Sequence, residues 1–222
     1  MTMPWDVAGG STIGRDHARA GRNNQDAFAT WARADAAAAV VCDGCGGALR
    51  SEWGAVLGAR LTAAALARRA DAPWDRLWPE VQGEVLAGLR AAAALVGDAH
   101  DHLLFTIVAA LARGDEASAA AIGDGTVVWD GAPLLDRDAA DAPAYLAYGL
   151  DGEAPAFRVL GRGPCRALAL GSDGAFGLAL APLFDDELVW RNPDGLRRRL
   201  VAAARAGACA DDATVALLRW TA

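Results

Sequence analysis

The chain of 222 residues contains no lysine, so all 21 of its basic residues are arginine. Codon usage explains such an arginine bias as readily as function does. Acidic residues outnumber the arginines, which gives a formal net charge of −7, and no basic stripe runs along the sequence. Nucleic-acid binding depends on such a stripe, so we expect no nucleic acid among the partners.

Long hydrophobic runs are also missing from the sequence. None approaches the roughly eighteen apolar residues that a membrane span requires, although 54% of the residues are hydrophobic. Residues 1–6 have neither the basic region nor the apolar core of an export signal. We therefore expect a cytoplasmic protein with no membrane partner. The length fits a single domain over residues 1–222, and nothing in the sequence requires more than a monomer.

Cysteine is sparse, with four residues at positions 42, 45, 165 and 209. Cys42 and Cys45 form a C-x-x-C pair, a spacing found in redox centres and zinc sites. Zinc would require a second close pair, which the other two cysteines do not form. A redox pair normally begins a helix, whereas Cys42 ends an apolar run and Cys45 lies in a glycine-rich turn. We interpret Cys42 as a small buried core residue.

Short clusters of aspartate and glycine are the most informative feature that the sequence does contain. They are Asp43-Gly44-Cys45-Gly46-Gly47, Ser172-Asp173-Gly174 and Asp211-Asp212-Ala213-Thr214. Each borders an apolar segment that we expect to be a strand. A carboxylate just beyond a strand end, with glycine beside it, lets several oxygen ligands converge on one hard cation. The sequence thus predicts a Mg²⁺ or Mn²⁺ site built from carboxylates that are far apart in the chain.

The rest of the pattern predicts both helices and strands. Helical spacing of apolar residues indicates helices over 51–69, 74–96, 176–180 and 195–206. Strands are expected over 7–11, 27–33, 36–42, 103–112, 117–122, 126–129, 144–148, 156–160, 167–170 and 214–220. Their hairpin spacing implies antiparallel sheets and an α+β fold class. Two sheets packed face to face, with helix pairs outside, would form a four-layer α-β-β-α sandwich and explain strands that are apolar on both faces.

Five motifs in a fixed order resemble those of the metal-dependent protein phosphatases of type 2C, the PPM family. They are residues 22–28 (RNNQDAF), 40–47 with the helix start at 51–55, 105–110 with the turn 123–125, 170–174, and 211–215. The bacterial subgroup with a Gln-Asp pair near the N-terminus is the most similar. The resemblance covers residues 14–220. It implies an enzyme that hydrolyses phosphoserine and phosphothreonine in proteins.

By this resemblance the site would hold two Mn²⁺ or Mg²⁺ ions. Asp43 would bridge both ions, the Gly44 carbonyl would ligate one of them, and Asp173 and Asp211 would complete the other. Asp124 would approach a looser, third ion. The catalytic residues would thus be Asp43, Asp173 and Asp211. Paired cations lower the pKa of a shared water, so a bridging hydroxide would attack phosphorus in line without a phosphoenzyme.

Three further residues are expected to support these ligands. Asp26 would hydrogen-bond a metal-bound water. Gln25, where the family commonly has glutamate, would hold such a water with less charge, which would weaken the affinity for one ion. Asp212 would hold the turn beside Asp211, but spacing alone leaves exchanged roles open for these adjacent carboxylates.

The sequence leaves the phosphate-binding group and the general acid open. Many family members have an arginine where this chain has Gly21, and Arg22, Arg19 or His17 could replace it. Some members have a histidine as general acid where this chain has Cys45, which is a poor acid at its usual pKa. Protonation would then come from a metal-bound water or His17, so slower turnover is expected.

The expected partner is a phosphorylated protein, and a Ser/Thr kinase or its target is the natural candidate. Two other hypotheses stay open. A regulatory binding module would keep the fold and one metal without turnover, with Gln25, Gly21 and Cys45 as traces of that loss. A hydrolase of small phosphoesters would need no protein partner.

Overall fold

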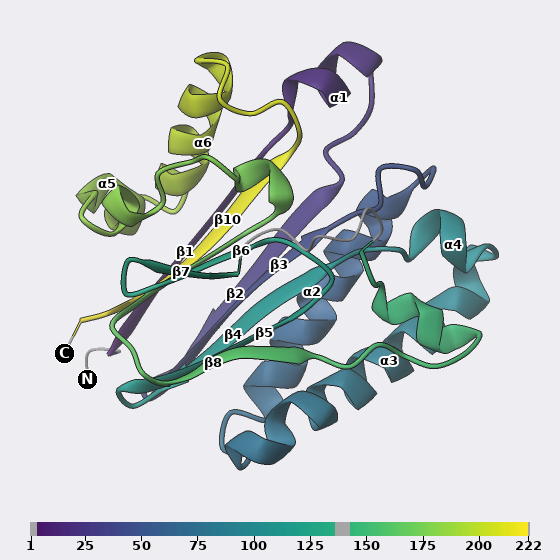
Figure 1. Ribbon diagram of the computed structural model, residues 1–222, viewed down its shortest axis with the longest axis horizontal. Helices are drawn as coiled ribbons and strands as arrows, with labels where there is room; N and C mark the ends of the chain where they lie inside the picture. The colour runs from purple at the N-terminus through teal and green to yellow at the C-terminus, as the bar shows by residue number, and fades with distance from the viewer. Residues whose placement is uncertain (1–3, 136–142, 222) are drawn as a thin grey trace.

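The computed structural model describes residues 4–135 and 143–221 (Figure 1). In these residues, two five-stranded antiparallel sheets pack face to face. The first sheet has the order β1 (Trp5–Thr12), β10 (Ala213–Trp220), β9 (Ala167–Gly171), β6 (Thr126–Trp129) and β7 (Ala132–Leu135). The second has the order β2 (Asp26–Ala32), β3 (Ala36–Asp43), β4 (Ile107–Arg113), β5 (Glu116–Ile122) and β8 (Arg158–Pro164).

Helices cover the outer faces of both sheets. The long helices α2 (Ser51–Arg68) and α3 (Trp74–Val96) lie over the second sheet, and α5 (Glu187–Arg191) and α6 (Gly195–Arg205) lie over the first (Figure 1). Two short helices, α1 (Arg15–Ala20) and α4 (Ala99–His102), lie in connections. The predicted α+β class and the four-layer α-β-β-α arrangement are confirmed.

Side chains that point alternately to the two faces of each strand explain the four layers. In β3, Ala37, Ala39 and Val41 face the core between the sheets. Their neighbours Val40 and Cys42 face the core beneath α2 and α3. Successive side chains of a strand point to opposite faces, so a strand between two apolar layers must be apolar at every position. The alanine-rich sequence of β3 satisfies this requirement, and Cys42 is a buried free thiol, as predicted.

The sequence-based predictions of two elements were wrong. Residues 144–148 were expected to be a strand but enter the 3₁₀ helix η1 (Leu146–Leu150), whose apolar residues pack beside α3. Residues 176–180 were expected to be a helix, but Gly177 has a φ of 80°, outside the right-handed helical region. Short 3₁₀ turns, η2 (Asp173–Ala175) and η3 (Ala181–Phe184), flank this segment instead.

The other differences concern boundaries and short elements. The strand expected over 103–112 begins only at Ile107, because residues 103–105 leave α4 and approach the turn after β3. Sequence reasoning missed α1, α4, α5 and β7, all of which are too short to show a clear apolar period. No helix among the described residues is long and apolar enough to cross a membrane.

Candidate metal centre

The predicted acidic residues gather where both sheets end. Asp26 begins β2 and Asp43 ends β3, and the two are direct cross-strand partners. In the other sheet, Asp173 follows β9, and Asp211 and Asp212 precede β10. Since β9 and β10 are antiparallel neighbours, the end of one lies beside the start of the other. The tertiary structure therefore brings carboxylates from both sheets to one region.

Asp43 lies among other carboxylates. Burial raises the pKa of the Asp43 carboxyl well above its usual value of 3.8, and the charges of Asp26 and Asp173 raise it further. A side-chain hydrogen bond with Asp173 and the charge of Asp124, in the turn between β5 and β6, act in the same direction. Such crowding of negative charge is unfavourable unless protons or cations compensate it.

Asp26 is buried and interacts with polar side chains at the ends of both sheets. Burial raises the pKa of its carboxyl well above the usual value, the hydroxyls of Ser172 and Thr214 oppose the rise, and the charge of Asp212 adds to it. Two buried polar atoms here, Asp26 Oδ2 and Gln25 Oε1, find no hydrogen-bond partner in the described part of the chain. Unpaired buried oxygens are costly, and they are well suited to bind water or a cation.

Gly44 packs too closely for any side chain. A β-carbon there would lie 2.7 Å from the Gln25 carbonyl oxygen and 2.8 Å from Ser51 Oγ. The Gly44 amide donates to Gln25 at 3.2 Å, and Gln25 Nε2 donates to Ser51 Oγ at 2.8 Å. The adjacent bridge to the strand segment before β4 uses the Asp43 carbonyl and the Cys45 amide, so the Gly44 carbonyl lies outside that bridge.

A second cluster consists of His17, Asp211 and Asp212. Asp212 is buried, and its carboxylate accepts hydrogen bonds from the amides of Gly14 at 2.7 Å and Gln25 at 2.6 Å. His17 Nδ1 lies 2.8 Å from Asp212 Oδ2 and 3.7 Å from Asp211 Oδ1. The Asp211 side chain is 56% exposed. Asp212 thus holds the opening loop, while Asp211 keeps its carboxylate accessible.

The two clusters are adjacent but do not merge into one tight cage. Among the described residues, His17, Asp211 and Asp212 are the trio whose metal-binding atoms all lie within 4.8 Å of one another, and Asp43, Asp173 and Asp211 do not meet this distance. A β-carbon on Gly174 would lie 3.2 Å from the Asp211 carbonyl carbon, so the loop after Asp173 touches the segment that carries Asp211. The ligand set of Asp43, Gly44, Asp173 and Asp211 remains a prediction.

These residues fit a hard divalent cation. The donors around Asp43 are carboxylate, carbonyl and amide oxygens, which suit Mg²⁺ and Mn²⁺. The crowded carboxyls of Asp43 and Asp173 and the unpaired oxygens of Asp26 and Gln25 are the features that such a cation or its water ligands would satisfy. His17 adds one imidazole at the edge, which Mn²⁺ tolerates better than Mg²⁺ does.

The three predicted phosphate-binding residues occupy different positions. His17 is held by Asp212, and its side chain is largely buried. Arg19 is exposed on α1. Arg22 donates to the Gly46 carbonyl at 2.8 Å and lines a pocket of about 240 Å³ whose wall includes Gln25. Of the three, Arg22 therefore shares a pocket with Gln25 and contacts the Gly-rich turn.

Sequence reasoning missed several supporting residues. Ser51 was interpreted only as the start of a helix, yet its hydroxyl links Gln25 to the Cys45 carbonyl. Ser172 accepts from the Thr214 amide at 3.0 Å and so ties the Asp173 loop to β10. Tyr145 hydrogen-bonds the side chain of Cys45, and burial is the main cause of its raised pKa. No motif indicates Tyr145, because it approaches the site only through the fold.

Fold and site together define a four-layer α+β protein with an oxygen-rich candidate metal centre at one end of its two sheets. A family model described as protein phosphatase 2C matches residues 13–205. The chain therefore belongs to the protein phosphatase 2C family, which confirms the resemblance drawn from the sequence motifs. A comparison with curated proteins finds no significant match.

Solved structures share this fold over nearly all of the chain. The catalytic domain of the serine/threonine protein phosphatase PstP, in complex with two manganese ions, is 23% identical with a TM-score of 0.58, and each chain is fully covered. PppA, a regulatory component of T6SS in Pseudomonas aeruginosa, is 22% identical with a TM-score of 0.61 and 98% coverage of both chains. RsbX in complex with magnesium is 9% identical with a TM-score of 0.61, covering 100% of this chain and 98% of RsbX. These likenesses show the fold.

Proposed function

We propose that this chain hydrolyses phosphoserine and phosphothreonine in proteins, using two Mn²⁺ or Mg²⁺ ions. Asp43, the Gly44 carbonyl, Asp173 and Asp211 would hold the ions, and Asp124 would hold a third. The manganese and magnesium in the similar PstP and RsbX structures support this choice of cation. We further propose that the protein acts as a cytoplasmic monomer on the products of a Ser/Thr kinase.

One observation carries the proposal: carboxylates from two separate sheets, Asp43 and Asp173, lie close enough to share a hydrogen bond in a site that raises the pKa of Asp43. When both carboxylates are ionised they repel each other, and burial penalises the charge on Asp43. Perturbed groups of this kind concentrate at functional sites, and a divalent cation would convert the repulsion into attraction.

Two divalent ions, when bound, supply an activated water nucleophile and neutralise charge on the phosphoryl group. The chain's own residues would do the rest. Asp26 and Gln25 each have a buried oxygen without a hydrogen-bond partner in the described part of the chain, and these oxygens would orient water. Asp212 anchors the opening loop, which keeps Asp211 facing outward. Arg22, in the pocket beside Gln25, would contact the phosphoryl oxygens of the substrate.

The test is a Mn²⁺ titration of purified protein with an aryl phosphate and with a phosphothreonine peptide. Hydrolysis should rise with Mn²⁺, and Asp173→Ala should abolish it. Asp151→Ala is the matched control, because that exposed carboxylate pairs with His100 and belongs to no predicted ligand set, so its loss should leave the rate unchanged. An inactive wild type at every Mn²⁺ concentration would favour the regulatory binding module. Activity without preference for the peptide would favour a hydrolase of small phosphoesters.

A further inference from the structure

Three large apolar side chains are exposed at and just before the first two turns of α2. Leu49 is 76% exposed, Trp53 62% and Val56 43%, and we call these three residues the α2 apolar surface. Single exposed apolar residues are common and need no explanation, but a cluster that includes tryptophan is typical of an interaction site. Tryptophan in particular contributes a large share of binding energy in protein interfaces.

The α2 apolar surface borders a groove of about 440 Å³. Its apolar lining consists of Trp53, Val56, Leu57, Val96 and Leu103, so α2, α3 and the segment after α4 all contribute. The groove is open and mostly apolar, and its shape is fixed by packed helices. An extended peptide with one or two large apolar side chains fits a site of this kind.

This groove adjoins a smaller pocket beside Gln25, one of the residues expected to support the metal ligands. Glu52 lines both the groove and the smaller pocket that contains Arg22 and Gln25. Asn23 donates to Glu52 Oε1 at 3.0 Å, which fixes the boundary between the two spaces. Gln25 in turn contacts Asp212 through its amide. A chain whose phosphorylated residue lies near Arg22 and Gln25 can therefore continue past Glu52 onto the α2 apolar surface.

The charged residues around the groove indicate the charge of the segment that it would bind. Arg60 lines the groove and Arg22 lines the adjoining pocket, and neither forms an ion pair with a carboxylate in the described ranges 4–135 and 143–221. In contrast, Arg197, Arg198 and Arg199 of α6 pair with Asp194 or Asp186. These two unpaired guanidiniums outnumber Glu52, the carboxylate that lines both spaces, so this rim is positive on a chain whose net charge is −7. Such a rim attracts an acidic segment and repels a basic one.

We propose that the α2 apolar surface binds the segment of a protein substrate that flanks its phosphorylated residue, and that this segment carries a large apolar residue next to acidic ones. This inference rests on the proposed phosphatase function and gives its substrate class. The apolar residue would pack on Trp53, and the acidic residues would face Arg22 and Arg60.

The experiment compares three substrates. The first is an aryl phosphate, the second is a phosphothreonine peptide with flanking leucine, phenylalanine and glutamate, and the third is the same peptide with alanine at the flanking positions. Both peptides are tested with the flanking residues before the phosphothreonine and with them after it. The wild type should prefer the apolar acidic peptide over its alanine version. Trp53→Ala should lower kcat/KM for that peptide about tenfold, as loss of a tryptophan anchor does, and leave the aryl phosphate rate unchanged. Arg60→Glu should weaken the preference through charge.

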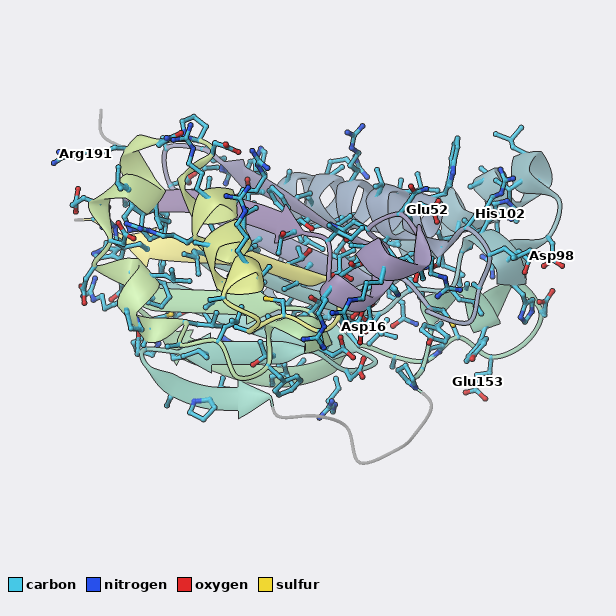
Figure 2. The ribbon with its side chains drawn as sticks, turned by 90° about the horizontal axis from the view of Figure 1, so that it is seen from above. Asp16, Glu52, Asp98, His102, Glu153 and Arg191 are labelled. Atoms are coloured by element: carbon cyan, nitrogen blue, oxygen red, sulfur yellow. The ribbon has the colours of Figure 1, made fainter. Side chains whose placement is uncertain are left out.

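Leu188→Ala is the matched control, because Leu188 is an exposed apolar residue of α5. Figure 2 shows Arg191 of the same helix at the opposite end of the molecule from Glu52 of α2. Equal peptide preference in the wild type and Trp53→Ala would overturn the inference, as would an equal loss on the aryl phosphate or a dimer that Trp53→Ala dissociates. A wild type inactive on every substrate would instead overturn the proposed function on which the inference rests.

Discussion

The carboxylate of Asp212 lies 2.6 Å from the backbone nitrogen of Gln25, 187 positions earlier in the chain. The same side chain accepts from the Gly14 amide at 2.7 Å and contacts His17 Nδ1 at 2.8 Å. One buried carboxylate before β10 thus fixes the loop that joins β1 to β2. Asp211, one residue earlier, has an exposed side chain and accepts from the Asp212 amide.

This difference predicts separate effects for the two adjacent aspartates. Asp212→Ala leaves two buried amides unpaired and should lower the free energy of unfolding by about 2–4 kcal/mol. Asp211→Ala removes an exposed side chain and should cost less than about 1 kcal/mol, yet abolish Mn²⁺-dependent hydrolysis. Urea denaturation and aryl phosphate assays on both variants measure these effects. Similar stability losses for the two variants would contradict the assignment of an anchoring role to Asp212 alone.

Gly44 gives a test of steric fit at the site. A β-carbon at Gly44 would meet the Gln25 carbonyl and Ser51 Oγ, whereas at Gly46 it would meet nothing within 4 Å. Gly44→Ala should therefore destabilise the protein by about 1–3 kcal/mol and disturb the candidate ligand carbonyl, while Gly46→Ala should be close to neutral. Thermal unfolding and Mn²⁺-dependent hydrolysis of both variants provide the comparison. A stable, active Gly44→Ala variant would show that this contact relaxes without cost.

The raised pKa of Asp43 predicts a pH dependence of stability. Burial is the main cause, and the charges of Asp26 and Asp173 add to it. A carboxyl with a raised folded-state pKa binds more protons folded than unfolded, so the stability gained from this proton is lost as the pH rises from 3.8 through the raised value. In EDTA, the free energy of unfolding should fall over that window, and less steeply for Asp43→Asn.

Added Mn²⁺ should reverse this trend, because the ion binds the deprotonated carboxylates and stabilises the folded state. Urea denaturation at a series of pH values, with EDTA or with Mn²⁺, measures both slopes. Identical slopes for the wild type and Asp43→Asn would refute a titrating role for Asp43. Asp151→Asn, at an exposed carboxylate that pairs with His100, controls for the loss of one charge.

Cys45 occupies the position where some family members have a histidine acid, and in this structure it hydrogen-bonds Tyr145. Loss of a general acid costs about 10²–10⁴-fold in rate. Since we expect the Cys45 thiol to donate no proton, Cys45→Ala should lower the rate by less than about tenfold. Steady-state hydrolysis of an aryl phosphate measures the change. A loss of a thousandfold would assign the proton transfer to Cys45 after all.

Much of the fold was predictable because its signals are local. The strand β3 is alanine-rich and the helix α3 has a regular apolar period, and both were placed within one residue of their observed bounds. The strand prediction for residues 144–148 was wrong because a short apolar run suits a strand and a 3₁₀ turn equally. The helix predicted over 176–180 does not form because Gly177 has a positive φ, which composition does not reveal.

By itself, the sequence determined which residues end the strands, that oxygen ligands dominate, and which family the motifs resemble. The tertiary structure alone decided that Asp212 is buried and Asp211 exposed, that Asp43 meets Asp173, and that Trp53 lies uncovered beside the site. The physical reason is that spacing along a chain fixes only local conformation. Burial, electrostatic contact and exposure arise from the packing of two sheets whose contributing residues are distant in sequence.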